Sequence, residues 1–452
     1  MAKTQITTGI DIGTDTIKIL AVKKDVDTGK ILDIVFFDKI KSNGVQKGRI
    51  RSAAEVVKKL QGLVERAEQI QGQKKSGTAD FYVSINGSKL QLLPSRGLII
   101  VGRADQKVSQ EDVDRIYQNA RAMNLQSANK EILEVFPKEW ILDGERDVKD
   151  PLNLHSARLE LEAYLLSVFS SDLDNVIEAV SGAGVEIDIE NVIASPVADA
   201  RSVLTPQQKE LGVALVNIGA STTGVSIYEE GKLLNLTVFP VGSANITNDI
   251  AIGFKTEIEV AEKIKKEYGS CSQSDSVGPK KIEIDLSAFN AGEEPENDDI
   301  EDNFFETINP NQKKAKAQPK IKKDKANYLV FDRKNLKKII DARVSEIYDL
   351  VNNEIKKVGK QGLLPGGIVL TGGGAKLPGM VELAKKEFNL PCRIGYPKEF
   401  SQQIMDPCFS TACGLVMDDY EEENGQSDFG REESGIGKIF SKIGNFIKNL
   451  VP

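Results

Sequence analysis

The chain has 452 residues, more than a single hydrophobic core usually supports, so we expect two to four subdomains. Hydrophobic residues make up 40% and charged residues 28%, as in an ordinary globular protein, and the formal net charge of −8 argues against general nucleic-acid binding. One histidine and four cysteines without metal-ligand spacing argue against a zinc centre or a Ser-His-Asp hydrolase.

The first predicted element is a strand–turn–strand unit, GIDIGTDTIKILAV, at residues 9–22. A second unit, LVNIGASTTGVSIY at residues 215–228, repeats its pattern. The aligned positions are Asp11 and Asn217, Gly13 and Gly219, and Thr16 and Thr222. A turn glycine lets the backbone approach an anion, and neighbouring hydroxyls add donors. One such hairpin is weak evidence, but a matched pair indicates two turns that clamp a polyphosphate. The residues predicted to bind it are Asp11, Gly13, Thr14, Asp15, Thr16 and Lys18 in the first unit and Asn217, Gly219, Ala220, Ser221 and Thr222 in the second.

Residues 81–165 read as strand, strand, helix, strand and strand, a compact α+β unit inserted after the first hairpin. The unit contains no cluster of charged residues suited to chemistry. We therefore expect it to make protein contacts.

A third glycine-rich element, GGIVLTGGGAKLPGM at residues 366–380, predicts a strand, a turn at Gly372, Gly373 and Gly374, and a helix. It has neither the G-x-G-x-x-G order nor the Walker spacing, which argues against a Rossmann or P-loop site. These glycines allow an adenine and a ribose to lie against the backbone.

Two phosphate hairpins followed by a glycine-rich adenosine turn resemble the actin, Hsp70 and sugar-kinase superfamily. Over most of the chain the resemblance narrows to the bacterial cell-division family FtsA, on ITNDIAIGFKTEIEVAEKIKKEYG after the second hairpin and LKKIIDARVSEIYDLVNNEI before the adenosine turn. It implies an α/β fold of the actin/Hsp70-like duplicated ATPase type, with two halves around a nucleotide cleft. It also implies an inserted SHS2-like unit called 1C, a C-terminal amphipathic helix, and ATP and Mg²⁺ as cofactors.

The resemblance assigns further roles to single residues. It implies that Glu262 and Lys265 border the ribose and adenine, with a solvated amphipathic helix as the alternative. It implies that Asp11 holds Mg²⁺ through water. It also implies that Arg343 and Glu346, one helical turn apart, contact the C-terminal peptide of FtsZ, with an ordinary surface ion pair as the alternative.

Three positions depart from the family pattern. Asn217 is a neutral amide where the second hairpin usually carries an acid, and Gly224 stands where another acid is common. Ser195 precedes Pro196 where a Gln or Glu usually orients the attacking water. No catalytic residue is therefore assigned with certainty, Asp11 being the best candidate. We expect ATP binding with weak or no hydrolysis. Normal hydrolysis and an empty cleft are the alternatives.

Residues 287–325 combine an acidic block with a lysine-rich block and few apolar residues, which is typical of a disordered surface loop. A docking segment centred on Phe304 and Phe305, or lysine contacts with acidic lipid, are the alternatives.

The chain ends in an acidic linker, predicted flexible, at residues 418–433 and the segment SGIGKIFSKIGNFIKNLVP at residues 434–452. Its apolar residues recur at helical spacing, with lysines opposite them. The residues predicted to contact a membrane are Ile436, Ile439, Phe440, Ile443, Phe446, Ile447, Leu450, Lys438, Lys442 and Lys448. Sixteen residues of it as helix, roughly 24 Å long, are too short to span a bilayer and fit the lipid headgroup layer. A helix docked on the protein's own core is the alternative. The segment is similar to the family's membrane-targeting sequence.

The predicted organisation follows the family's subdomain names. Subdomain 1A takes residues 1–80 and 166–204, with 1C at 81–165 between them and a return to 1A at 395–417. Subdomain 2A takes 205–262 and 346–394, with 2B at 263–345 between them. The linker at 418–433 and the membrane helix at 434–452 complete the chain.

The resemblance implies an ATP-binding, actin-like protein that polymerises head to tail on the cytoplasmic face of the inner membrane at the division site. It is expected to be a peripheral membrane protein that tethers the FtsZ ring. The expected partners are the FtsZ C-terminal peptide, further copies of the chain, anionic lipid and downstream division proteins, and no nucleic acid. One alternative is a PilM-like scaffold of type IV pilus assembly, which the hairpin IGASTTGVSI resembles. Another is a small-molecule kinase of the same superfamily, which Asn217 and Gly224 deprive of an obvious catalytic aspartate.

Overall fold

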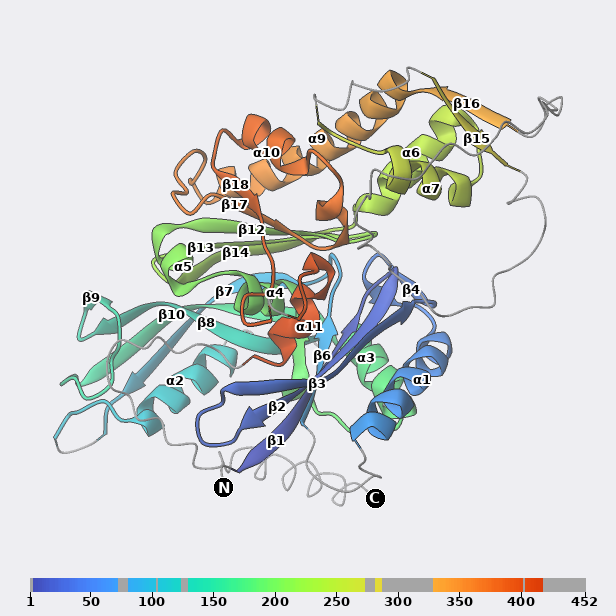
Figure 1. Cartoon of the computed structure of the whole chain (residues 1–452). Helices are drawn as coiled ribbons and strands as arrows, with labels where there is room; N and C mark the ends of the chain where they lie inside the picture. Colours follow the sequence, from blue (N-terminus) through green and yellow to red (C-terminus); the bar gives the residue numbers. More distant parts are fainter. Residues whose placement is uncertain are drawn as a thin grey trace. The chain divides into compact units, whose positions relative to one another are not determined.

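The computed structural model (Figure 1) describes residues 3–71, 80–102, 105–122, 129–272, 281–286, 328–400 and 403–417. The insertion predicted at 287–325, the linker at 418–433 and the amphipathic helix at 434–452, with all its assigned membrane-contacting residues, lie outside the described residues. Among the helices of the described ranges, none is long and apolar enough to cross a lipid bilayer.

Two five-stranded sheets share one topology. The first contains β1 (Thr4–Ile12), β2 (Thr16–Asp25), β3 (Ile31–Lys41), β6 (Asp80–Ile85) and β11 (Val192–Ala194), and the second contains β12 (Val213–Ile218), β13 (Thr223–Glu229), β14 (Lys232–Phe239), β17 (Ile368–Thr371) and β18 (Cys392–Ile394). Their orders are β11-β6-β1-β2-β3 and β18-β17-β12-β13-β14. In each sheet a three-stranded antiparallel meander continues into two parallel strands. This duplication confirms the predicted fold class.

Helices cover both sheets, as expected for strands that are buried along most of their length. The first half contains α1 (Ala53–Gln71), α3 (Ser170–Gly182), α4 (Ser195–Val203) and α11 (Ser410–Leu415), and the second contains α5 (Pro206–Leu211), α6 (Ser243–Phe254), α7 (Ile258–Tyr268), α9 (Arg333–Lys357) and α10 (Met380–Phe388). Short elements are β4 (Val45–Gln46), β5 (Arg49–Ile50), β15 (Lys281–Asp285), β16 (Tyr328–Asp332) and the 3-10 turns η1 (Ile189–Asn191), η4 (Gly373–Lys376) and η5 (Pro407–Phe409).

A separate four-stranded sheet forms the inserted α+β unit. Its order is β7-β10-β8-β9, built from β7 (Gln91–Ile100), β8 (Lys130–Leu142), β9 (Glu145–Val148) and β10 (Arg158–Phe169), with α2 (Gln110–Ala122) packed on β7. The helix approaches the strand closely because residue 97 is glycine: a Cβ there would lie 2.7 Å from the carbonyl oxygen of Ile116.

One strand differs from the sequence interpretation. Residues 81–85 were expected to open the inserted unit, but β6 pairs in parallel with β1 in the first sheet. Its last residues, Val83 to Ile85, are buried, so this apolar strand fits a central position better than an exposed sheet edge.

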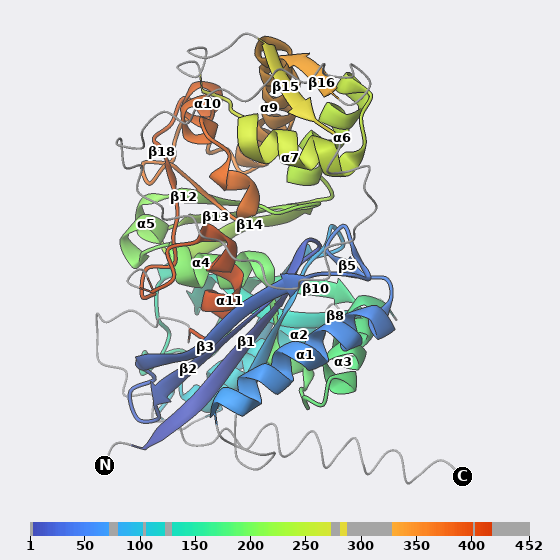
Figure 2. The same ribbon diagram turned by 45° about the vertical axis from the view of Figure 1, so that its right-hand side comes forward.

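The last helix returns the chain to the first half. Figures 1 and 2 show α11 beside α4, and the two helices are in contact. A Cβ on Gly414 would lie 1.7 Å from the carbonyl oxygen of Ala198, so only glycine allows this approach.

We expect Gly414→Ala to lower the free energy of unfolding by about 2–3 kcal/mol through overpacking, measured by urea denaturation. Gly102→Ala is the matched control, because a Cβ there meets nothing within 4 Å. Equal stability of the two variants would contradict the packing.

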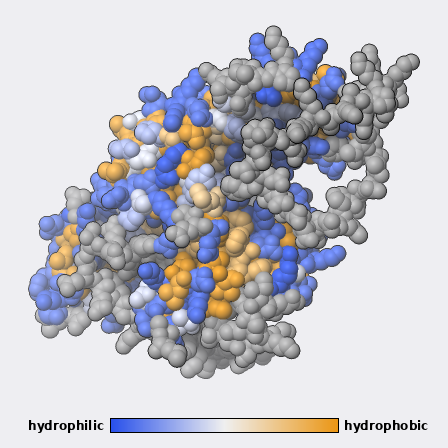
Figure 3. All heavy atoms as spheres, in the orientation of Figure 1, coloured by the Kyte–Doolittle hydropathy of each residue, from blue (hydrophilic) through white to orange (hydrophobic). Residues whose placement is uncertain are grey.

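The face shown in Figure 3 carries an apolar area where β3 and α11 lie. Leu32 and Phe37 of β3 are 50% and 44% exposed, and the Phe37 ring meets that of Phe409 edge to face at 5.8 Å.

Candidate functional site

The two predicted hairpins close in the same way. The Gly13 N–H donates to the Thr16 carbonyl oxygen at 3.1 Å, and the Gly219 N–H donates to the Thr222 carbonyl oxygen at 2.8 Å. The strand registers also correspond, because Asp11 pairs with Lys18 in the first hairpin and Asn217 with Gly224 in the second. The sequence repeat is therefore a repeat of backbone geometry.

The tips of the hairpins touch each other. The Ser221 hydroxyl donates to Thr14 Oγ1 at 2.8 Å, and the Gly48 N–H donates to the same oxygen at 3.2 Å. Among the hydrogen bonds of the described residues, none satisfies the N–H groups of Thr14, Asp15, Ala220 and Ser221. Two short turns thus meet with free backbone donors, the arrangement that binds phosphate oxygens.

A buried ion pair closes the first hairpin. Lys18 Nζ lies 2.8 Å from Asp11 Oδ2, and the Ser84 hydroxyl donates to Asp11 Oδ1 at 2.9 Å. Asp11 and Lys18 are 6% and 7% exposed. Burial acts to lower the pKa of Lys18, but the Asp11 carboxylate outweighs it, so that the pKa lies above its ordinary value. The cation predicted to face phosphate is therefore neutralised by its own hairpin.

The glycine-rich turn packs on the second hairpin. Gly372 has φ +84°, and a Cβ there would lie 2.1 Å from Asn217 Oδ1. A Cβ on Gly374 would lie 2.5 Å from Ile218 Cγ2, and one on Gly373 would lie 3.3 Å from Cys408 Sγ. The predicted adenosine turn and the second hairpin therefore form one contiguous surface, which side chains at these positions would disrupt.

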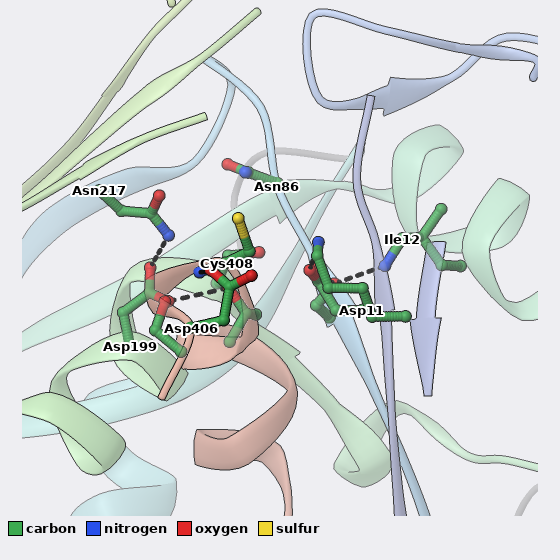
Figure 4. A network of polar contacts seen from close by, with 12 residues as sticks. Asp11, Ile12, Asn86, Asp199, Asn217, Asp406 and Cys408 are labelled. Carbon is green, nitrogen blue, oxygen red and sulfur yellow. Dashed lines mark hydrogen bonds and ion pairs between the residues drawn. The ribbon is translucent and has the colours of Figure 1, made fainter. Parts of the chain in front are cut away.

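Asp199 of α4 belongs to this site, and sequence reasoning missed it (Figure 4). Its Oδ2 accepts from Asn217 Nδ2 at 2.6 Å, and its Oδ1 accepts from the Ser410 and Thr411 hydroxyls, both at 2.8 Å. The residue is 1% exposed. The feature of the sequence that could have revealed Asp199 is its position between two alanines, Ala198 and Ala200, in a helix of small residues.

Burial raises the pKa of the Asp199 carboxyl from 3.8 to about 6, although its three hydrogen bonds oppose the rise. Because the folded pKa is the higher one, this carboxyl favours the folded state below its unfolded pKa, and the benefit is lost as pH rises to about 6. We expect the free energy of unfolding of the wild type, relative to Asp199→Asn, to fall by about 3 kcal/mol between about pH 4 and pH 7. Urea denaturation across that range measures it, and parallel curves for the two proteins would contradict it.

Ser195, at the position of the usual water-orienting residue, is 3% exposed. Its hydroxyl donates to the Ile85 carbonyl oxygen at 3.4 Å. The Ser195 hydroxyl is thus hydrogen-bonded to the neighbouring strand β6.

Glu262 and Lys265 form a compact ion pair on α7. Lys265 Nζ lies 2.6 Å from Glu262 Oε2 and also donates to the Thr247 hydroxyl, which donates to Glu262. Burial would raise the pKa of Asp15 at the tip of the first hairpin, but Lys41, Lys266 and Lys18 lower it below its usual value. The positive charge of Lys266 on α7 therefore helps to lower the pKa of Asp15 in the first hairpin.

Arg343 and Glu346 form the ion pair that the sequence left as an alternative, with Nη1 and Oε2 2.6 Å apart. Arg343 also binds Asp249 of α6 through two bonds of 2.6 and 2.9 Å, a partner that sequence reasoning missed. This bidentate contact fixes the guanidinium on α6.

The carboxylates of the site determine whether it can hold a metal ion. Within the described ranges, no group of three or more His, Cys, Asp and Glu side chains is placed to hold a metal ion. Magnesium commonly keeps several waters and takes one or two carboxylates plus phosphate oxygens. The Asp11 carboxylate of the first hairpin fits that mode, provided that phosphates supply the other oxygens.

Comparison with known proteins shows to which family this chain is similar. A family model described as "Cell division protein FtsA" matches residues 214–414, and one described as "SHS2 domain inserted in FTSA" matches residues 87–167. A cell division protein FtsA of Borreliella burgdorferi is 31% identical over 446 residues, covering 97% of this chain and 98% of the relative. One from Pseudomonas aeruginosa is 29% identical, covering 90% and 88%.

A solved structure of the PilM–PilN type IV pilus biogenesis complex is similar in fold, with 15% identity, a TM-score of 0.56 and coverage of 91% of this chain and 97% of that one. Duplicated sheets, paired hairpins and the inserted SHS2 unit define an actin-like protein. The chain belongs to the FtsA family and is an actin-like cell division protein.

Proposed function

We propose that this chain binds ATP with Mg²⁺ between its two hairpins, polymerises head to tail, and tethers the FtsZ ring to the cytoplasmic face of the inner membrane at the division site. The observation that carries the nucleotide part is the contact between Ser221 and Thr14, which joins two matched turns with free N–H groups. Family membership supports the division role.

In this proposal the phosphates lie on the turns that begin at Gly13 and Gly219, and Asp11 holds Mg²⁺ through water. Bound Mg²⁺ supplies positive charge that stabilises the triphosphate. Gly372, Gly373 and Gly374 face the adenosine, with Glu262 and Lys265 at its border. The side chain of Lys18 holds Asp11 in place.

Hydrolysis of ATP is weak or absent in this proposal. The Ser195 hydroxyl is bonded to the Ile85 carbonyl oxygen and buried, so it does not orient water as a Gln or Glu side chain does. Asn217 adds no charge to the second hairpin, which weakens electrostatic stabilisation of phosphoryl transfer.

The partners follow from the family and from charge. In this proposal the FtsZ C-terminal peptide binds the helix that carries Arg343 and Glu346. The Glu346 side chain is 56% exposed and so can contact a peptide. Residues 434–452 bind anionic lipid, and a filament adds avidity because it presents many such segments. The inserted unit makes contacts between copies, and downstream division proteins bind the assembled filament. The subdomain boundaries predicted from the sequence are part of this proposal, except that residues 81–85 belong to the first sheet.

Equilibrium titration of the intact chain with a fluorescent ATP analogue tests the nucleotide part, with phosphate release measured in parallel. We expect saturable binding of one nucleotide per chain with slow release of phosphate. Absence of saturable binding, with or without Mg²⁺, would contradict the proposal.

A further inference from the structure

The carboxylate of Asp199 occupies a junction between three elements. It lies on α4 and accepts hydrogen bonds from Asn217 on β12 and from Ser410 and Thr411 on α11. Both oxygens are used, and the residue is 1% exposed. A carboxylate this buried is retained only where its hydrogen bonds are satisfied.

This carboxylate fixes the orientation of the Asn217 amide. An ionised carboxylate only accepts hydrogen bonds, so the amide nitrogen must face Asp199. Figure 4 shows this nitrogen directed at Asp199 and the amide oxygen directed away. That oxygen lies against Gly372, at the predicted adenosine turn.

The contact also accounts for the missing acid of the second hairpin. An aspartate at position 217 would bring a second carboxylate to within hydrogen-bond distance of Asp199. Two carboxylates so close cannot both stay ionised. The negative charge therefore resides on α4, and position 217 presents a neutral acceptor instead.

We propose that Asp199 is a positioning residue of the nucleotide site, which turns the Asn217 amide so that its oxygen accepts from the hydration shell of a bound Mg²⁺–nucleoside triphosphate. The inference rests on the proposed nucleotide binding and assigns a role to a residue outside the hairpins. Asp199 acts through Asn217 and does not touch the ligand.

The test uses three variants of the full chain: Asp199→Asn, Asn217→Asp and the double exchange Asp199→Asn/Asn217→Asp. Affinity for a fluorescent ATP analogue is measured with Mg²⁺ and with EDTA, and stability is measured by thermal unfolding. Glu160→Gln is the matched control, a 3%-exposed carboxylate paired with Arg96 and Arg158 in the inserted unit. It should lose stability without changing the ratio of the two affinities.

We expect Asp199→Asn to lower affinity for Mg²⁺–ATP about tenfold, because the charged hydrogen bond that orients Asn217 is lost. The double exchange restores the hydrogen bond in the opposite sense and places the acid in the second hairpin. Its stability should return towards that of the wild type, and the ratio of affinity with Mg²⁺ to affinity with EDTA should exceed that of the wild type about tenfold.

Two results would overturn the inference while leaving the proposed function intact: wild-type affinity in Asp199→Asn, or a double exchange whose Mg²⁺ ratio equals that of the wild type. The double exchange also covers the case in which a single variant does not fold. A wild-type chain that binds no ATP would instead contradict the proposed function itself.

Discussion

Replacing Asp11 with alanine is expected to lower the affinity for Mg²⁺–ATP at least about 100-fold and the free energy of unfolding by about 3 kcal/mol. The variant removes the first-hairpin carboxylate that is proposed to hold Mg²⁺. It also leaves the Lys18 ammonium, 7% exposed, without its counter-ion. Titration with a fluorescent ATP analogue and urea denaturation measure the two effects.

A second variant separates binding from stability. Asp11→Ala/Lys18→Met also removes the ammonium that Asp11→Ala leaves without a counter-ion. The free energy of unfolding should therefore recover relative to Asp11→Ala, while ATP affinity stays low. Asp38→Ala is the control on the same sheet: its ion pair with Arg66, 3.0 Å, is partly exposed. This control should change stability by less than about 1 kcal/mol and ATP binding not at all. Wild-type ATP affinity in Asp11→Ala would refute the role assigned to this carboxylate.

Deleting residues 434–452, which lie outside the described residues, is expected to abolish co-sedimentation with anionic vesicles, a loss of at least about tenfold in bound protein. The predicted helix buries an apolar face in the lipid, and each of its three lysines adds about 1 kcal/mol near anionic lipid. Sedimentation of intact and truncated protein with vesicles of neutral and anionic lipid measures the effect.

The lysines and the apolar face have separable contributions. Changing Lys438, Lys442 and Lys448 to glutamine should remove the preference for anionic over neutral vesicles and the sensitivity to salt, but should retain part of the binding. ATP affinity should be unchanged in the truncated chain. Equal sedimentation of truncated and intact protein would mean that the membrane contact lies elsewhere.

The hairpins and the duplicated fold were predictable because their signals are local. A turn glycine, flanking hydroxyls and alternating apolar strands lie within fourteen consecutive residues, and the second copy repeats them. The same locality made the glycine turn at Gly372 visible, since its left-handed backbone demands glycine.

Contacts between distant segments were not predictable. Asp199 meets Ser410 and Thr411 across more than two hundred residues, and Arg343 meets Asp249 from another helix. Neither contact produces a spacing pattern in the sequence, because its partners lie far apart in the chain. Aspartate and arginine are also common as ordinary surface charges, so the residue types alone give no signal. β6 was misassigned for a related reason: the local sequence of a short buried strand does not say which sheet it joins.

The most direct test of nucleotide binding between two hairpins is a crystal structure of the intact chain grown with ATP and Mg²⁺. The account predicts phosphate oxygens within hydrogen-bond distance of the backbone N–H groups of Thr14 and Ser221, with the adenosine against Gly372. Nucleotide bound elsewhere, or none bound at saturating ATP, would contradict it.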